Sequence, residues 1–276
     1  MSQNPLQQYF RQPKIFMPLP SRGIYNRLGS LQGDVSNMAI FGLTGMDEIL
    51  LKTPDALFTG TATIKVIQSC CSCVVDAWEL PILDIDALLV AIRIATYGNK
   101  MAITNKCVHC GEDSDYELDL SRNLDHFNNC KFDSKVVLKD LTIKIKPLTY
   151  KQSTAFNLEN FSIQKKINNA IKLEDQEEET QRLINEGFQE MGNLQNRICA
   201  ASIDQIQSAD SVVEEREFIN EWVENTDTAD IDKIKKHIEQ NNTVWRVPPT
   251  IVKCEECGAE NQVNVDMDQA NFFVAA

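Results

Sequence analysis

The sequence predicts an α+β protein with three parts: a helical N-terminal core, a split four-cysteine zinc ribbon of short antiparallel strands, and an inserted module of a β-hairpin and helices. Three observations predict this fold class. Residues 44–97 carry helix start and stop signals around apolar runs, residues 101–120 alternate apolar with polar side chains, and a Cys-x-x-Cys-Gly motif occurs twice. The 276 residues, 43% of them hydrophobic, suffice for one large domain or two smaller ones.

The first stretch, residues 1–43, is predicted to be an extended N-terminal arm. It carries four basic residues, Arg11, Lys14, Arg22 and Arg27, against Asp34 alone. Its apolar residues lie among prolines and glycines and follow no helical period, so they cannot build a core of their own. The pattern is consistent with an arm that docks on a partner and equally with an arm that folds back on its own domain.

Residues 44–120 predict the helical core and the first cysteine motif. A capping box begins at Thr44 and precedes a short apolar run. Thr53-Pro54 supplies an N-cap and a first-turn proline for a second helix, which we expect to continue to about Cys71. A third helix covers residues 82–97 and stops at Gly98; twelve of its sixteen residues are apolar, so we expect it to be covered on nearly all sides.

The middle of the chain, residues 121–250, is predicted to be the inserted module. Val136–Leu138 and Leu141–Ile145 flank a two-residue turn and predict a hairpin, and residues 149–241 read as helical. Expected features there are a first helix with one apolar face, an acidic segment at 174–190, a helix near Ser211–Glu224 and a last helix at Asp230–Gln240; the apolar face comprises Phe156, Phe161, Ile163, Ile167 and Ile171. Strands are expected around Val244–Val247 and Ile251. We interpret the acidic runs as solvated faces, with partner binding as the alternative.

Two cysteine motifs with similar flanking residues indicate a metal site. Lys106-Cys107-Val-His-Cys110-Gly111 and Lys253-Cys254-Glu-Glu-Cys257-Gly258 each lie between short predicted strands. The glycine permits a positive φ, so that backbone N–H groups can turn toward the sulfurs. Two such knuckles complete a tetrahedral site, and we expect Cys107, Cys110, Cys254 and Cys257 to bind one structural Zn²⁺. Residues 121–250 then lie between the two halves of one ribbon, and residues 251–276 form the second knuckle and a C-terminal tail.

Other interpretations of the cysteines are a redox Cys-x-x-Cys, two metal sites shared between subunits, or unpaired thiols. A thioredoxin-like motif needs its first cysteine at a helix N-terminus, whereas both motifs here lie between predicted strands. Cys70, Cys71 and Cys73 could form a second metal site or a redox sensor, although buried small residues are the favoured interpretation. Cys130 and Cys199 are expected in the core. His109 lies inside the first knuckle, too close to bind the same metal, and is expected to be exposed, while His126 and His237 lack ligand spacing.

The composition excludes or disfavours several classes of function. With 40 acidic against 27 basic residues the formal net charge is −13, which repels phosphate backbones and argues against bulk nucleic-acid binding. The most apolar run, 82–97, is interrupted by Asp84, Asp86 and Arg93, which favours a buried helix over a membrane span. The first residues lack the pattern of a signal peptide, so we expect a soluble protein made in the cytosol. Because phosphate loops, nucleophile elbows and zinc-protease motifs are absent, we expect no enzyme.

Several stretches together resemble the T4-type bacteriophage baseplate protein family. These are Leu50-Leu-Lys-Thr-Pro-Asp-Ala-Leu-Phe-Thr-Gly60, Val66-Ile-Gln-Ser-Cys70, the helix from Asp84 to Asn99, and the first knuckle before Tyr116-Glu-Leu-Asp-Leu120. The resemblance covers residues 35–160 well and the remainder loosely. It implies a non-enzymatic hub subunit or hub assembly factor, with other hub or wedge proteins as partners. It also implies a location in the virion tail baseplate, or in the host cytoplasm during assembly. The rival functions are a zinc-ribbon nucleic-acid-binding protein and a thiol-disulfide protein that uses Cys107 and Cys110.

Overall fold

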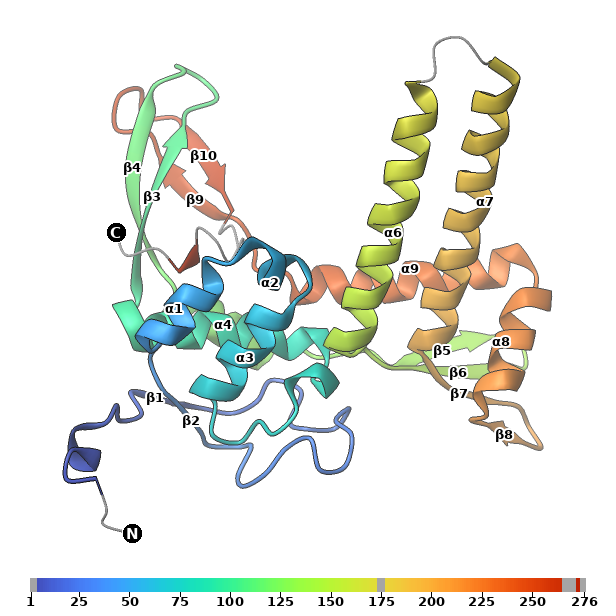
Figure 1. The fold of residues 1–276 in the computed structure, drawn as a ribbon. Helices are drawn as coiled ribbons and strands as arrows, with labels where there is room; N and C mark the ends of the chain where they lie inside the picture. The colour runs from blue at the N-terminus through green and yellow to red at the C-terminus, as the bar shows by residue number, and fades with distance from the viewer. Residues whose placement is uncertain (1–3, 173–176, 265–271, 274–276) are drawn as a thin grey trace. The chain divides into compact units, whose positions relative to one another are not determined.

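The structure, a computed structural model, describes residues 4–172, 177–264 and 272–273 and contains two compact units (Figure 1). The first comprises the residues up to Cys130 together with those from Trp245 onward, and the second comprises Lys131–Val244. The second unit is therefore shorter at both ends than the insertion expected at 121–250. The predicted fold class is confirmed, since helices combine with small antiparallel sheets. Among the described residues, no helix has the length and apolar character needed to cross a bilayer.

The helical core of the first unit is built from α1 (Gly45–Leu51), α2 (Pro54–Phe58), α3 (Thr61–Cys70) and α4 (Ile82–Tyr97), with a 3-10 turn, η2, at Ala77–Glu79. The Thr44 side chain accepts the Asp47 backbone N–H, and the predicted capping box is present. The single helix expected from Thr53 to Cys71 is wrong, because Gly60 adopts φ +75° and ends α2 before α3 begins. Gly98 stops α4 as predicted, and α4 is buried along most of its length.

The N-terminal segment, residues 4–43, belongs to the first unit, and from Lys14 onward it folds back on that unit. It contains the 3-10 turn η1 (Gln7–Tyr9), and β1 (Ile15–Met17) pairs antiparallel with β2 (Met38–Ile40). Leu19 is fully buried, and the Ser21 backbone N–H and hydroxyl donate to the buried Asp84 carboxylate of α4 at 2.8 and 2.6 Å. Arg11 fixes the beginning of this segment by donating to the Ser69 carbonyl at 2.6 Å. From Lys14 onward the structure therefore shows the arm folded back on its own domain, which is one of the two alternatives for residues 1–43.

The ribbon strands of the first unit form two separate hairpins. β3 (Lys100–Lys106) pairs with β4 (Asp113–Asp119), and β9 (Thr250–Lys253) pairs with β10 (Glu260–Val263), both antiparallel. Between β4 and the second unit lies α5 (Ser121–Asn129), a helix that the sequence analysis did not anticipate. The strand expected at Val244–Val247 is wrong, because the preceding helix continues to Trp245. Phe272 and Phe273, near the C-terminus, are buried.

The second unit is organised around a four-stranded antiparallel sheet in the order β5-β6-β7-β8. β5 (Lys135–Leu138) and β6 (Leu141–Ile145) form the predicted hairpin, while β7 (Ile203–Gln207) and β8 (Val212–Val213) extend it. The expectation that 149–241 is helical throughout is therefore wrong at 203–213. Ile203 and Ile206 are buried in the same core cluster as Ile143 of β6. Residues three apart on a regular strand point to opposite faces, and both reach this core because the pairing of β6 with β7 shifts register between Lys144 and Ile145.

Four helices complete the second unit: α6 (Tyr150–Ile171), α7 (Glu177–Ser202), α8 (Arg216–Asn225) and α9 (Thr228–Trp245). α6 and α7 lie side by side as an antiparallel hairpin around a small core of Ile163, Ile167 and Leu194 (Figure 1). Phe161 and Ile171 are more than half exposed, so the single apolar face expected for this helix is wrong at these two positions. The helix expected from Ser211 begins at Arg216 instead.

Candidate metal centre

The two cysteine knuckles have the same backbone conformation. In the first, the Cys107 N–H donates to the Glu112 carbonyl at 2.9 Å and the Gly111 N–H donates to the Cys107 carbonyl at 3.0 Å. In the second, the Cys254 N–H and the Gly258 N–H make the corresponding bonds at 2.9 Å. Gly111 and Gly258 adopt φ +79° and +73°, a region in which a side chain would be strained. The repeated motif therefore encodes a repeated local structure, as predicted.

The knuckles bring the four predicted cysteines together although 143 residues separate Cys110 from Cys254. The Sγ atoms of Cys107 and Cys257 are 3.7 Å apart, and so are those of Cys110 and Cys254. All four sulfur atoms lie within 4.8 Å of one another. In a tetrahedral site with Zn–S bonds of about 2.3 Å, neighbouring sulfurs are about 3.8 Å apart. Two of the sulfur–sulfur distances match this value and all are within 4.8 Å, so the four thiols could hold a tetrahedral metal ion.

Polar groups from neighbouring strands surround the sulfurs. Asn261 of β10 is 3% exposed, and its Nδ2 donates to the Cys107 Sγ at 3.4 Å. The Oδ1 of the same side chain accepts the Val108 backbone N–H at 3.1 Å, so Asn261 joins the second hairpin to the first knuckle. The Ser114 hydroxyl of β4 lies 3.6 Å from the Cys254 Sγ, so Ser114 in turn joins the first hairpin to the second knuckle. Such outer contacts orient metal ligands and hold their geometry.

The electrostatic environment differs between the two cysteines of each knuckle. The backbone N–H of Cys110 foremost, and that of His109, lower the pKa of Cys107 to about 6. The pKa of Cys254 is also lowered, chiefly by the backbone N–H of Cys257. At Cys110 and Cys257 a backbone amide acts in the same direction, but burial and the neighbouring thiols outweigh it and raise the pKa, to about 12 for Cys110. Four thiolates this close would repel one another, so a cation among them would favour the deprotonation of all four.

The other cysteines lie elsewhere. Cys70, Cys71, Cys73 and Cys199 are buried, as expected, whereas Cys130 is only half-buried. Burial raises the pKa of Cys70 to about 11, which favours an inert thiol. Among the described residues, the four knuckle cysteines are the one group of three or more His, Cys, Asp or Glu side chains arranged to hold a metal ion. Cys70, Cys71 and Cys73 form no second group of this kind with other described residues.

The histidines also lie outside this group. His109 is exposed in the first knuckle, and only its backbone N–H contacts a sulfur, that of Cys107 at 3.4 Å. The Nε2 of His126 lies 3.5 Å from the Cys130 Sγ, and the Nε2 of His237 lies 2.9 Å from the Asp133 carbonyl oxygen. The four cysteines are thus the complete set of candidate ligands in the described part of the chain.

Comparison with known proteins places the chain in a family. The family model described as T4 bacteriophage base plate protein matches residues 43–274, which include both knuckles and the whole second unit. The chain belongs to this family. As a T4 base plate family member, it has a structural role in a phage tail baseplate, with other baseplate proteins as its partners. No curated protein and no solved structure matches the chain.

Proposed function

We propose that the protein is a non-enzymatic hub component or hub assembly factor of the phage tail baseplate, and that it acts through protein–protein contacts. Family membership supports the baseplate role. The surface supports contact with other proteins, because the described residues of the N-terminal segment include six large apolar side chains that are more than half exposed; they are Leu6, Tyr9, Phe10, Phe16, Ile24 and Leu28. Three of these side chains, Leu6, Tyr9 and Phe10, lie within five residues of one another, and exposed apolar side chains that gather into a patch mark interaction sites.

The proposal includes one structural Zn²⁺ bound by Cys107, Cys110, Cys254 and Cys257. The observation that carries it is the spacing of the four sulfur atoms, which matches a tetrahedral four-thiolate site. A zinc ion bound there supplies a cross-link between the two hairpins and has no open coordination position for catalysis. The cysteines hold the ion, while Asn261 and Ser114 orient two of the sulfurs.

Such a cross-link has a consequence for the whole chain, because the second unit lies between the two knuckles in sequence. The free energy of metal binding is added to the free energy of folding of the first unit. The entropic cost of closing so long a loop grows only slowly with its length, so a large insertion is compatible with a stable ribbon. A bound ion would thus hold together the two hairpins of the ribbon, which the second unit separates in sequence.

Two alternatives are less well supported. A zinc-ribbon nucleic-acid-binding protein needs a basic face beside the knuckles, but the second knuckle carries Glu255 and Glu256 and the chain has a net charge of −13. A thiol-disulfide protein would use two cysteines of one motif, whereas both 3.7 Å sulfur contacts join one knuckle to the other. The arrangement favours metal binding over either alternative.

The baseplate role can be tested in phage-infected cells. A tagged copy of the protein is purified from the lysate, and mass spectrometry identifies the co-purified proteins and the proteins of mature particles. We expect hub or wedge proteins to co-purify with it. A hub component should also be present in mature particles, whereas an assembly factor should occur only in host cytoplasmic intermediates. A protein found free of other baseplate proteins at every stage would contradict the proposal.

A further inference from the structure

The sheet of the second unit has one covered face and one open face. Ile143 of β6, Ile206 of β7, Ile219 of α8 and Ile234 of α9 share one buried core on the covered side. The opposite face is hollowed over β5, β6 and β7, with a volume of about 610 Å³. This volume lies within the range of about 300–1,000 Å³ that is typical of ligand sites. We call this feature the sheet hollow.

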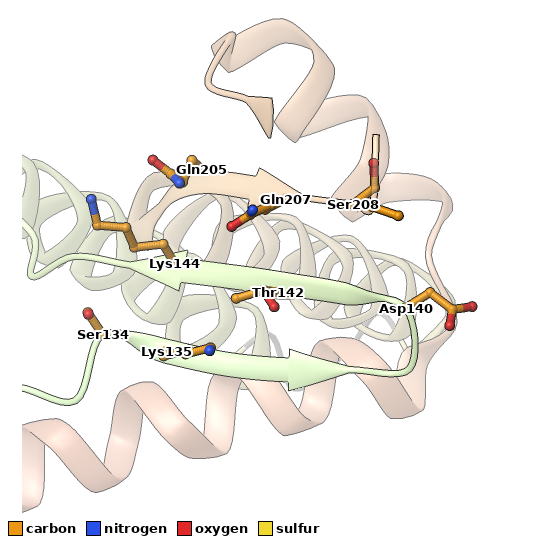
Figure 2. A pocket seen from close by; sticks show the side chains of 9 residues that line it. Ser134, Lys135, Asp140, Thr142, Lys144, Gln205, Gln207 and Ser208 are labelled. Carbon is orange, nitrogen blue, oxygen red and sulfur yellow. The ribbon is translucent and has the colours of Figure 1, made fainter. Parts of the chain in front are cut away.

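The side chains that line the sheet hollow come from all three strands (Figure 2). They include Lys135 from β5, Thr142 and Lys144 from β6, and Gln205 and Gln207 from β7. The side chains of Thr142, Gln205 and Gln207 make no hydrogen bond to any residue that the structure describes. They therefore offer free amide and hydroxyl groups, which can pair with a peptide backbone.

Two lysines lie side by side at one end of the sheet hollow. Lys135 and Lys144 are directly opposite each other in the register of β5 and β6, an arrangement that is destabilising for like charges. The Lys144 Nζ lies 3.2 Å from the Asp204 carboxylate, which also pairs with Lys146 at 3.1 Å. Lys135 has no ion pair with a described residue. A carboxylate from another molecule would relieve the repulsion between the two lysines.

The charge of this region is opposite to that of the protein. Residues 131–151 contain six lysines and two aspartates, whereas the whole chain has a net charge of −13. Asp140, at the turn between β5 and β6, lies at the other end of the sheet hollow from the paired lysines (Figure 2). This carboxylate and Asp204 disfavour a continuous polyanion such as nucleic acid, but they leave room for a ligand with a few spaced carboxylates.

We propose that the sheet hollow binds an extended acidic segment of another baseplate protein. The segment places its carboxylates on Lys135 and Lys144, and its backbone faces Thr142, Gln205 and Gln207. In an extended segment alternate side chains point to the same side, so an acidic residue at every second position can face the sheet. The inference rests on the proposed function only in naming a baseplate protein as the partner.

The test uses the full chain and a fluorescent ten-residue peptide of alternating Glu and Gly, with a Gln-Gly peptide as its uncharged match. Anisotropy titrations at low salt should show tighter binding of the Glu peptide, weakened by added salt. The double variant K135Q/K144Q should bind it about fivefold more weakly, as expected for the loss of two exposed charge pairs. The control K165Q/K236Q has the same charge change at exposed lysines of α6 and α9 and should bind like the wild type. Circular dichroism checks that each variant is folded.

Several results would overturn the inference. These are equal binding of the Gln peptide, equal losses in the two double variants, or tighter binding of single-stranded DNA than of the Glu peptide. Sedimentation showing a dimer that only K135Q/K144Q disrupts would assign the sheet hollow to a second copy of the chain instead. None of these results bears on the particle composition or on the zinc content, so failure here is distinguishable from failure of the proposed function.

Discussion

The hairpin of α6 and α7 makes a sharp prediction at two glycines of the same helix. Gly187 and Gly192 both lie inside α7. A Cβ added at Gly187 would lie 2.4 Å from the Cγ1 of Ile167 and 2.9 Å from its Cδ1, whereas one added at Gly192 would meet nothing within 4 Å. Contacts below 3.0 Å require the buried Ile167 side chain to move. Gly187 therefore allows the close approach of the two helices, and Gly192 does not serve this purpose.

The magnitudes follow from two opposing effects. Replacing a helical glycine by alanine stabilises a helix by about 1 kcal/mol. Overpacking of a core costs about 1–3 kcal/mol. Gly192→Ala should therefore raise the stability of the hairpin by about 1 kcal/mol. Gly187→Ala should be neutral or destabilising by up to about 2 kcal/mol, because the steric cost offsets or exceeds the gain in helix propensity.

Native-state hydrogen exchange of the α6 and α7 amides measures this local stability directly. The clash can be isolated with Ile167→Ala, which removes both of the crowding atoms. In a double-mutant cycle, Gly187→Ala should be less harmful in the Ile167→Ala background than in the wild type. If Gly187→Ala protects the α7 amides as much as Gly192→Ala does, the close packing of the two helices at this point is refuted.

Two further predictions concern the first unit. Burial raises the pKa of Asp84 to about 7 against the opposing effect of its hydrogen bonds from Ser21. The folded state therefore binds a proton more readily than the unfolded state between pH 3.8 and about 7, and stability should fall as pH rises through this window. Urea titrations across this range should show that the free energy of unfolding depends less on pH in Asp84→Asn than in the wild type. An equal pH dependence in the two proteins would contradict a raised pKa of the buried Asp84 carboxyl. Arg11→Gln removes the hydrogen bonds to Ser69 and should lower the free energy of unfolding by about 1–3 kcal/mol. Arg27→Gln, an exposed control in the same segment, should leave it unchanged, and equal effects of the two variants would refute the anchoring role of Arg11.

The sequence predicted best where the local chain encodes its own structure. Each Cys-x-x-Cys-Gly motif contains both the ligands and the glycine that the turn requires, so the two knuckles could be recognised without knowledge of the fold. The capping box at Thr44 and the stop at Gly98 are similarly local. That the four sulfurs lie together follows from the pairing of two equivalent half-sites, and this too was predictable.

The remaining features depend on contacts between distant segments. Asn261 and Ser114 contact the sulfurs only because the two hairpins meet, and nothing in their own neighbourhood marks them. β7 was missed because it follows α7 directly at Ser202, without a glycine or proline to signal the change. The interruption of the helix at Gly60 could have been predicted, because a glycine between two threonines is a plausible break.

Cysteine-to-serine variants test whether the four cysteines of the cluster form one metal site. Cys107→Ser and Cys254→Ser each remove one ligand of the same site, so both should loosen the ribbon to a similar degree. The double variant should cost little beyond either single one, because the two changes are coupled through one ion. Cys130→Ser, at a half-buried cysteine outside the cluster, should retain the metal. Additive losses in the double variant would indicate two independent sites.

Metal content combined with X-ray absorption at the zinc edge tests the central claim most directly. The full chain, purified without added metal or chelator, should contain one zinc per chain with four sulfur ligands at about 2.3 Å and no nitrogen or oxygen ligand. Two zincs per chain, a mixed ligand shell, or a folded and partner-binding protein without zinc would contradict the assignment of Cys107, Cys110, Cys254 and Cys257 as one closed structural site.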